Sequence, residues 1–229
     1  MTTPGTASLT NVLKNRHGIL NSFLAGLRPL DPRNAAFSGR AVTLRFVPLR
    51  EDLAPLTRVA NPEGAAHRAF DAIRKGDVLV IEGMGRDDCA VAGDVIFAHL
   101  RNLGAVGTVA DAGIRDAAAC ADILPCHCRG PAPPASYHRL MAIEAQGPVA
   151  IGGCAVMPGD TIVADNDGAV VVPAALAEQA LAQAAELDDL DLYIRLRVEA
   201  GESMKGLYPA TDTIRPAYRD WVAKGRPGA

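Results

Sequence analysis

The feature that most constrains the fold is a strand, helix and strand pattern in the middle of the chain. Residues 77–83 form a short apolar run, 94–104 reads as a helix that starts at Asp94 and ends at Gly104, and 106–112 is a second apolar run. Two parallel strands need a crossover of this kind, usually a helix. The pattern therefore predicts a βαβ unit and an α/β fold, with a loop over 83–93 between the first strand and the helix.

The flanking segments predict an antiparallel second half and helices at both ends. Turn signals at 158–160 and 166–168 separate three apolar runs, which predicts an antiparallel meander. The full set of further expected elements is a helix within the first 30 residues, a strand at 41–47, a helix from Pro62 to Gly76, the meander strands 149–156, 161–165 and 169–173, a long helix from Pro173 to Gly201 and a short one around 216–222.

Composition favours one soluble domain over residues 1–229. Hydrophobic residues make up 49% of the chain and charged residues 21%, which is ordinary for a protein that folds by burial. The net charge is −3 and no run of Lys and Arg occurs, so we expect no nucleic-acid partner. No apolar stretch reaches the roughly 18 residues of a membrane helix, and no secretion signal is evident. We expect no membrane association and a cytoplasmic protein.

The five cysteines do not indicate a disulfide framework, because their number is odd and a chain of this size does not need one. The triplet 126–128, Cys-His-Cys, raises the alternative of zinc. Zinc sites usually need a second ligand pair, which the chain lacks, and on a strand the two cysteines would simply share a face. We expect reduced thiols.

Common catalytic motifs are absent from the chain. There is no GxSxG, phosphate-binding GxxxxGK[ST] or HExxH sequence, and Asp88 stands where a dinucleotide fingerprint would need its third glycine. The four lysines lie beside polar residues or glycine, which disfavours Schiff-base catalysis. These absences disfavour serine hydrolases, nucleotide enzymes, zinc proteases and lysine-dependent aldolases.

Two strand-to-helix junctions of the βαβ unit carry the candidate site. The helix that begins at 93-GDVI-96 offers unpaired main-chain N–H groups as a seat for a carboxylate. Arg115 follows the next strand, and parallel strands end on the same side of their sheet, so its guanidinium could reach the same anion. If Asp94 lies close, it would orient Arg115.

Asp116 is a candidate ligand for Mg²⁺ or Mn²⁺, since Mg²⁺ is commonly held by one or two carboxylates plus water and substrate. A metal beside a carboxylate clamp suits the cleavage of a 2-oxo acid through an enolate. A simpler alternative stays open: Asp94 and Asp116 are both good helix N-caps, and Arg115 could be an ordinary ion-pair partner.

The stretch 93-GDVIFAHLRNLGAVGTVADAGIRD-116 resembles the signature of the RraA-like family, which includes 4-hydroxy-4-methyl-2-oxoglutarate and 4-carboxy-4-hydroxy-2-oxoadipate aldolases. Two further segments resemble parts of the family: 156-VMPGDTIVADNDGAVVVP-173 and 206-GLYPATDTIRPAYRDW-221. The resemblance implies a swivelling phosphohistidine-domain-like α/β/α sandwich. It also implies homotrimers or homohexamers with active sites between subunits, and the helical segment at about 174–222 is expected at such an interface.

The resemblance also implies roles for individual residues. Arg115 would bind the substrate carboxylate, Asp116 would hold the divalent metal, Mg²⁺ or Mn²⁺, and Asp94 would support the arginine and position a catalytic water. The main-chain amides around Val95 and Ile96, after Gly93, would receive the carboxylate.

The activity implied is that of a carbon–carbon lyase, a class II pyruvate aldolase that cleaves a 4-hydroxy-2-oxo acid and also decarboxylates oxaloacetate. The family also contains regulators that bind and inhibit ribonuclease E, which is the alternative from another class. A methyltransferase label exists in the family, but this chain has no glycine-rich loop for S-adenosylmethionine. Arg86, in the charged stretch 83–93, is a candidate for the distal end of the substrate.

Overall fold

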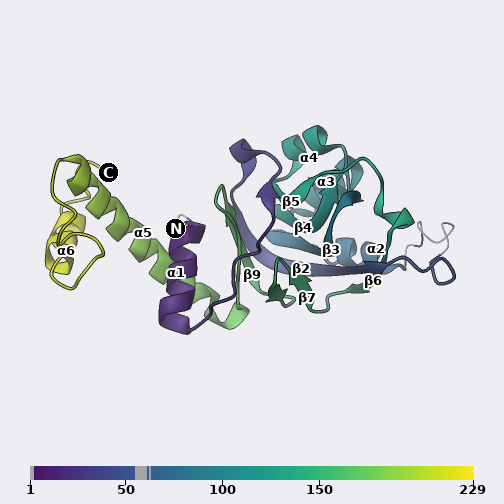
Figure 1. Ribbon diagram of the computed structural model, residues 1–229, viewed down its shortest axis with the longest axis horizontal. Coiled ribbons are helices and arrows are strands. Elements are labelled where there is room, and N and C mark those ends of the chain that lie inside the picture. Colours follow the sequence, from purple (N-terminus) through teal and green to yellow (C-terminus); the bar gives the residue numbers. More distant parts are fainter. Residues whose placement is uncertain (1–2, 55–60, 62) are drawn as a thin grey trace.

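The computed structural model describes residues 3–54, 61 and 63–229, and its centre is one twisted mixed sheet (Figure 1). The strands are β1 (Arg28–Pro29), β2 (Phe37–Pro48), β3 (Asp77–Ala92), β4 (Gly107–Ile114), β5 (Cys126–Pro131), β6 (Leu140–Ala145), β7 (Val149–Ile151), β8 (Cys154–Val156), β9 (Thr161–Asp165) and β10 (Gly168–Val172). The helices are α1 (Thr6–His17), α2 (Ala65–Asp71), α3 (Asp94–Leu103), α4 (Ala117–Ile123), α5 (Ala177–Glu199) and α6 (Arg215–Ala223), with 3-10 turns at Pro32–Asn34, Ser136–His138 and Ala174–Leu176.

The predicted βαβ unit forms the middle of the sheet. The strand order is β1-β5-β4-β3-β2-β9-β10, and β2, β3, β4 and β5 run parallel. The long strand β2 pairs antiparallel with β9 through its first residues and with β6 through its last ones. The mixed α/β fold with an antiparallel second half is thereby confirmed.

The two faces of the sheet are covered differently. Helices α2, α3 and α4 lie on one face over a core in which Phe97 and Leu100 of α3 are fully buried. On the opposite face, the β7–β8 hairpin and the segment around Leu24 and Leu27 cover a second core. The third core lies where α1 and the first half of α5 pack on β9 and β10. These helices lie at the β9 end of the sheet, opposite α2 (Figure 1).

The C-terminal arm, which we define as residues 190–229, extends away from the sheet (Figure 1). It has a small core of its own, in which Tyr193 on α5 meets Tyr218 and Trp221 on α6 at ring-centroid distances of 5.9 and 5.2 Å. The indole N–H of Trp221 donates to the carbonyl of Pro227 at 3.0 Å. The expected terminal helix is therefore present, and aromatic packing holds it against the end of α5.

The expected loop over 83–93 is wrong, because β3 continues through it as far as Ala92. Met84 and Gly85 take the left-handed conformation, with φ of 60° and 69°, and the pairing of β3 with β4 shifts register between Ile81 and Ala92. Irregular residues of this kind interrupt the alternation of side chains but not the strand, as in a β-bulge. The charged side chains therefore lie on a distorted strand.

Three other boundaries also differ from the predictions. The meander is two units, because β7 and β8 form a separate two-stranded sheet while β9 and β10 extend the main one. Helix α1 stops at His17, where Gly18 is left-handed, and leaves Leu20 mostly exposed outside it. Helix α2 covers only Ala65–Asp71; Pro62, its expected start, lies outside the described residues.

Candidate functional site

The ends of β3 and β4 bring the predicted site residues together at one edge of the sheet. The main-chain N–H of Arg115 donates to the carbonyl of Ala92 at 3.1 Å, which ties the end of β4 to the residue just before Gly93. Helix α3 starts directly after Gly93, and α4 starts directly after Asp116. The expected meeting of the two junctions is therefore present in the structure.

Gly93 allows the side chain of Arg115 to lie across the start of α3. A Cβ atom at position 93 would come within 2.8 Å of Arg115 Cγ and 3.2 Å of an Asp116 carboxylate oxygen. The φ of Gly93 is −152°, which is extended backbone that any residue can adopt. A glycine is needed here because of this close approach and not because of its conformational freedom.

Arg115 and Asp116 form a partly exposed ion pair. Arg115 Nε donates to Asp116 Oδ2 at 2.9 Å, and the two side chains are 49% and 42% exposed. The terminal guanidinium nitrogens bond to none of the described residues. At this exposure the pair adds little to stability, but it orients the guanidinium and leaves its two outer nitrogens for a ligand.

Asp116 is held in a strained backbone conformation. It precedes α4 with φ 51° and ψ 41°, the left-handed region, and its side chain makes no capping hydrogen bond to the helix. Aspartate tolerates this region better than most residues, at a cost on the order of 1 kcal/mol. The structure thus does not support the simple N-cap interpretation of Asp116, because its carboxylate bonds to Arg115 instead.

Asp94 lies in the first turn of α3, and Gly93 is the capping residue. The Oδ1 atom of Asp94 accepts a hydrogen bond from the main-chain N–H of Val95 at 2.7 Å. No hydrogen bond or ion pair joins Asp94 to Arg115 in the described part of the chain, so its supporting role stays a prediction. The first helical hydrogen bond of α3 runs from Phe97 to Gly93, which leaves the N–H of Ile96 at the open end of the helix.

The thiol nearest the site is not a nucleophile. Cys120 on α4 is buried, and its Sγ donates to the carbonyl of Arg115 at 3.2 Å. Burial raises the pKa of Cys120 to about 12, with the carboxylates of Asp94 and Asp116 adding to the effect. A thiol with this pKa stays protonated at neutral pH.

The Cys-His-Cys triplet lies on β5 as the strand interpretation predicts. Cys126 and Cys128 face the helix-side core, while the buried His127 ring faces Phe37 on the other side and bonds to the Ala35 carbonyl at 3.0 Å. All five cysteines are free and buried. Within the described residues, no group of three or more His, Cys, Asp and Glu side chains is placed to hold a metal ion.

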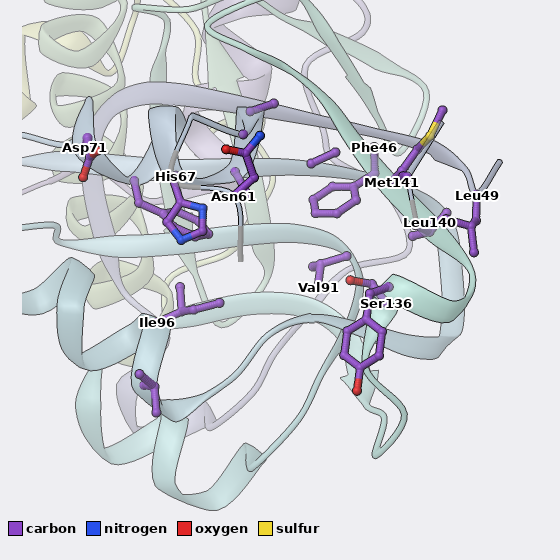
Figure 2. Close-up of a pocket in the computed structure, with 18 of the residues that line it drawn as sticks. Phe46, Leu49, Asn61, His67, Asp71, Val91, Ile96, Ser136, Leu140 and Met141 are labelled. Atoms are coloured by element: carbon purple, nitrogen blue, oxygen red, sulfur yellow. The ribbon is translucent and has the colours of Figure 1, made fainter. Parts of the chain in front are cut away.

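Two pockets lie next to the candidate residues. The smaller, of about 370 Å³, is shallow and lies beside Arg115 and Asp116 at the ends of β4 and β5. The larger, of about 580 Å³, is lined by Val95 and Ile96 together with residues of α2, β2, β3 and β6 (Figure 2). Helix α3 therefore lines the larger pocket, while the smaller one is lined by the residues around Arg115 and Asp116.

The larger pocket was missed at the sequence level. Its walls include Phe46, Phe70, Val91 and Met141, which come from segments far apart in the chain. Each looks like an ordinary core residue in its own strand or helix, so no local signal could have identified it. Arg86, expected near the substrate, forms an ion pair with Asp88 on β3 and lines neither pocket.

A protein-family model described as RraA-like, Aldolase/RraA, matches residues 6–171. The chain belongs to the RraA-like family. The matched region contains the complete candidate site and ends before α5, so the C-terminal arm lies outside it.

Similar proteins carry both enzyme and regulator names. A curated relative from Halalkalibacterium halodurans, named "Putative 4-hydroxy-4-methyl-2-oxoglutarate aldolase", is 37% identical over 121 residues, which is 52% of this chain and 57% of that protein. The chain thus spans little more than half the length of this relative. Streptomyces coelicolor RraAS2, described as an unusual member of the RNase ES inhibitor RraA protein family, has a solved structure that is 33% identical with a TM-score of 0.72, over 83% of this chain and 91% of that one.

A second solved structure, of an uncharacterized protein from Pseudomonas syringae pv. tomato, is 27% identical with a TM-score of 0.75 over 89% of this chain and 92% of that one. These neighbours confirm the RraA-type fold. No helix in the described part of the chain combines the length and hydropathy needed to cross a membrane.

Proposed function

We propose that this protein is a divalent-metal-dependent lyase of 2-oxo acids, which cleaves a 4-hydroxy-2-oxo acid to pyruvate and a second carbonyl compound and also decarboxylates oxaloacetate. The observation that carries the proposal is the position of Arg115: its side chain lies against Gly93 at the N-terminus of α3, and its two terminal guanidinium nitrogens bond to none of the described residues. The similarity to an aldolase-named relative supports the same chemistry.

The substrate carboxylate binds between the guanidinium of Arg115 and the first turn of α3. A carboxylate takes two parallel hydrogen bonds from a guanidinium, and a helix N-terminus adds N–H donors and a favourable dipole. The N–H of Val95 is already directed to Asp94 Oδ1, so that of Ile96 is the better placed donor. This arrangement fixes the 2-oxo group beside Asp116.

Asp116 is a suitable ligand for a divalent metal ion, although it supplies only one carboxylate. Its Oδ2 is bound to Arg115, while Oδ1 bonds to none of the described residues and the side chain is 42% exposed. Mg²⁺ and Mn²⁺ sites often use one or two carboxylates, with water and substrate completing the coordination. When bound there, the ion would supply Lewis-acid polarisation of the 2-oxo group.

The proposed role of Asp94 is to support proton transfer at the start of α3. Retro-aldol cleavage requires removal of the 4-hydroxyl proton as the C3–C4 bond breaks, and the bonding electrons go to an enolate that is then protonated at C3 to give pyruvate. We assign Asp94 to position the water that takes this proton. Loss of CO₂ from oxaloacetate gives the same pyruvate enolate, so the same residues serve both reactions.

We further propose that the protein acts in the cytoplasm as a homotrimer or homohexamer. Arg115 and Asp116 are about half exposed, and the pocket beside them is lined by the ends of β4 and β5, the first residue of α4 and the segment after β5. A neighbouring subunit would close it, and the arm, with the aromatic core of its own, is a candidate for such contacts.

A regulator of ribonuclease activity is the second candidate. The observation that favours it is the 33% identity with RraAS2, described as a member of an RNase ES inhibitor family. Inhibition would depend on an outer surface and not on the pocket beside Arg115. Activity of a ribonuclease E preparation, measured with wild type and with the Arg115→Ala variant, separates the two: equal inhibition by both, with no pyruvate released, supports the regulator.

The test of the proposed lyase is pyruvate release from oxaloacetate and from 4-hydroxy-4-methyl-2-oxoglutarate, with Mg²⁺ or with a chelator. Arg115→Ala and Asp116→Ala are compared with Arg215→Ala and Asp212→Ala, which remove an exposed ion pair in the arm. We expect metal-dependent turnover that only the first two variants lose. Turnover indifferent to these variants would remove the site from the proposal, and no turnover on either substrate would remove both reactions.

A further inference from the structure

The larger pocket begins at the first turn of α3, whose open main-chain N–H groups also belong to the candidate carboxylate site. Val95 lies at its rim with 79% of its surface exposed, and Ile96 lines it from the same turn. A ligand whose carboxylate is bound by the Ile96 N–H and Arg115 would therefore have the rest of its chain at the pocket mouth. One turn of an α-helix rises only about 5 Å, which roughly four consecutive carbon–carbon bonds span.

The walls of this pocket are apolar and already desolvated. Phe46, Phe70, Val91 and Leu140 are each exposed by less than a tenth. Met141 is partly buried and lies next to Leu140 at the edge of the pocket (Figure 2). Phe46 comes from β2, Phe70 from α2 and Met141 from β6, so three elements enclose one space. Its volume of about 580 Å³ is in the range of pockets that bind small molecules.

The charged groups around the pocket disfavour the binding of a second substrate carboxylate there. Among its described lining residues there is no Lys or Arg, and the titratable groups are His67, Asp71, His99 and Tyr137. A carboxylate inside would lose its hydration without gaining a cationic partner, and the Asp71 carboxylate would repel it. The pocket therefore suits a chain that is uncharged.

We propose that this pocket binds an uncharged aromatic or branched-alkyl substituent at C4 of the 2-oxo acid. The inference rests on the proposed function, because the carboxylate end is placed by Arg115. It makes Phe46, Phe70 and Met141 the determinants of substrate choice. The preferred substrate is then a 4-hydroxy-2-oxo acid with a bulky apolar C4 group, and a 2-oxo diacid is the poorer one.

Equilibrium binding of three non-cleavable compounds tests this without relying on turnover. Pyruvate, 2-oxoglutarate and 2-oxo-4-phenylbutanoate share the 2-oxo acid group, and the last two differ in carrying a carboxylate or a phenyl ring at C4. By calorimetry in the presence of Mg²⁺, we expect the phenyl compound to bind roughly 10- to 100-fold more tightly than pyruvate, since it buries an aromatic ring. We expect 2-oxoglutarate to bind no better than pyruvate.

Met141→Lys is the variant that locates the effect. It places a cation at the pocket wall, so it should abolish the advantage of the phenyl compound over pyruvate. Met157→Lys is the matched control, because Met157 is 48% exposed and lies outside this pocket. Sedimentation velocity on both variants checks assembly; if Met141→Lys alone dissociates an oligomer, the pocket is a subunit contact and the inference is overturned.

The outcomes separate this inference from the proposed function. If pyruvate binds through Arg115 but the phenyl ring adds nothing, or if Met141→Lys leaves its advantage intact, the apolar subsite is wrong and the lyase stands. If the phenyl compound binds equally well to Arg115→Ala while no substrate releases pyruvate, the pocket exists but the proposed function fails. If none of the three compounds binds, both fail.

Discussion

The sheet domain, by which we mean the described residues before 190, and the C-terminal arm bury their apolar side chains in different ways. In the sheet domain, helices and strands far apart in sequence enclose continuous cores, and the family match covers it from residue 6 to 171. In the arm, seven buried residues form a core between the end of α5 and α6. The candidate residues of the site all lie in the first region.

The largest expected difference in kcat/KM is between a variant that lacks an arginine of the sheet domain and one that lacks an arginine of the arm. Arg115→Ala removes the guanidinium that would bind the substrate carboxylate, so kcat/KM for pyruvate release should fall on the order of 100-fold or more. Arg215→Ala, which removes an arm ion pair, should leave it within about twofold. A comparable loss in both variants, measured by a coupled pyruvate assay, would contradict the division between the regions.

Gly93→Ala tests the close approach at the site itself. The added methyl group would push against Arg115 Cγ, so we expect roughly a 10- to 100-fold loss of kcat/KM through misplacement of the guanidinium, with the thermal unfolding midpoint nearly unchanged. Gly5→Ala is the matched control, because its φ of −64° suits alanine and its nearest contact would be an ordinary 3.5 Å. Full activity of Gly93→Ala would show that the position of Arg115 is not critical.

Core substitutions should distinguish one cooperative unit from two. Phe97→Ala empties a fully buried site between α3 and the sheet and should lower the free energy of unfolding by about 3–5 kcal/mol. Trp221→Ala should release α6 while the main calorimetric transition moves little. Amide hydrogen exchange would show protection lost only in the arm. If Trp221→Ala shifts the main transition as far as Phe97→Ala does, the arm and the sheet domain unfold together.

The two regions should also respond to acid in different pH ranges. Burial lowers the pKa of His127, whose Nδ1 has no partner in the described structure, so the folded protein keeps the ring neutral. The unfolded chain takes up this proton below about pH 6.5, so stability should fall as the pH drops below that value. Chemical denaturation at pH 7.5 and 5.5 should show a smaller decrease for His127→Leu than for wild type, and no such difference for exposed His138→Leu.

The arm should lose its own stabilisation only at lower pH. Hydrogen bonds from Arg226 and, to a lesser extent, Tyr218 lower the pKa of Asp189. A depressed carboxylate pKa stabilises the folded form above the unfolded value of about 4, and this contribution is lost as the pH falls through the folded pKa. Tryptophan fluorescence of Trp221 should therefore stay constant from pH 7 to 5, and a change near pH 6 would contradict this assignment.

The candidate site was predictable in its first residues but not in its surroundings. The sequence places Gly93 and Asp94 after one strand and Arg115 and Asp116 after the next, and parallel strands bring such ends together. The sequence does not show that the carboxylate of Asp116 bonds to Arg115, or that the carboxylate of Asp94 bonds to the Val95 N–H and not to Arg115. Both hydrogen bonds depend on side-chain directions that the backbone at each strand-to-helix junction fixes.

The bulged half of β3 shows a second limit of sequence patterns. Its charged residues, including Arg86 and Asp88, interrupt the apolar alternation, and the predicted loop follows from that interruption. The pairing of β3 with β4 keeps the segment extended despite its composition, since main-chain hydrogen bonds do not depend on side-chain polarity.

By itself the sequence determined the βαβ unit, the helices that follow it and which residues are candidates for binding an anion, because these depend on local periodicity and on short spacings along the chain. The tertiary structure decided which face each strand buries, how β9 and β10 join the sheet, and where the apolar pocket lies. The pocket, for example, forms only when Phe46, Phe70 and Met141, which are far apart in the sequence, come together. Contacts of that kind leave no periodic signal, since their energy depends on the packing of distant elements and not on neighbouring residues.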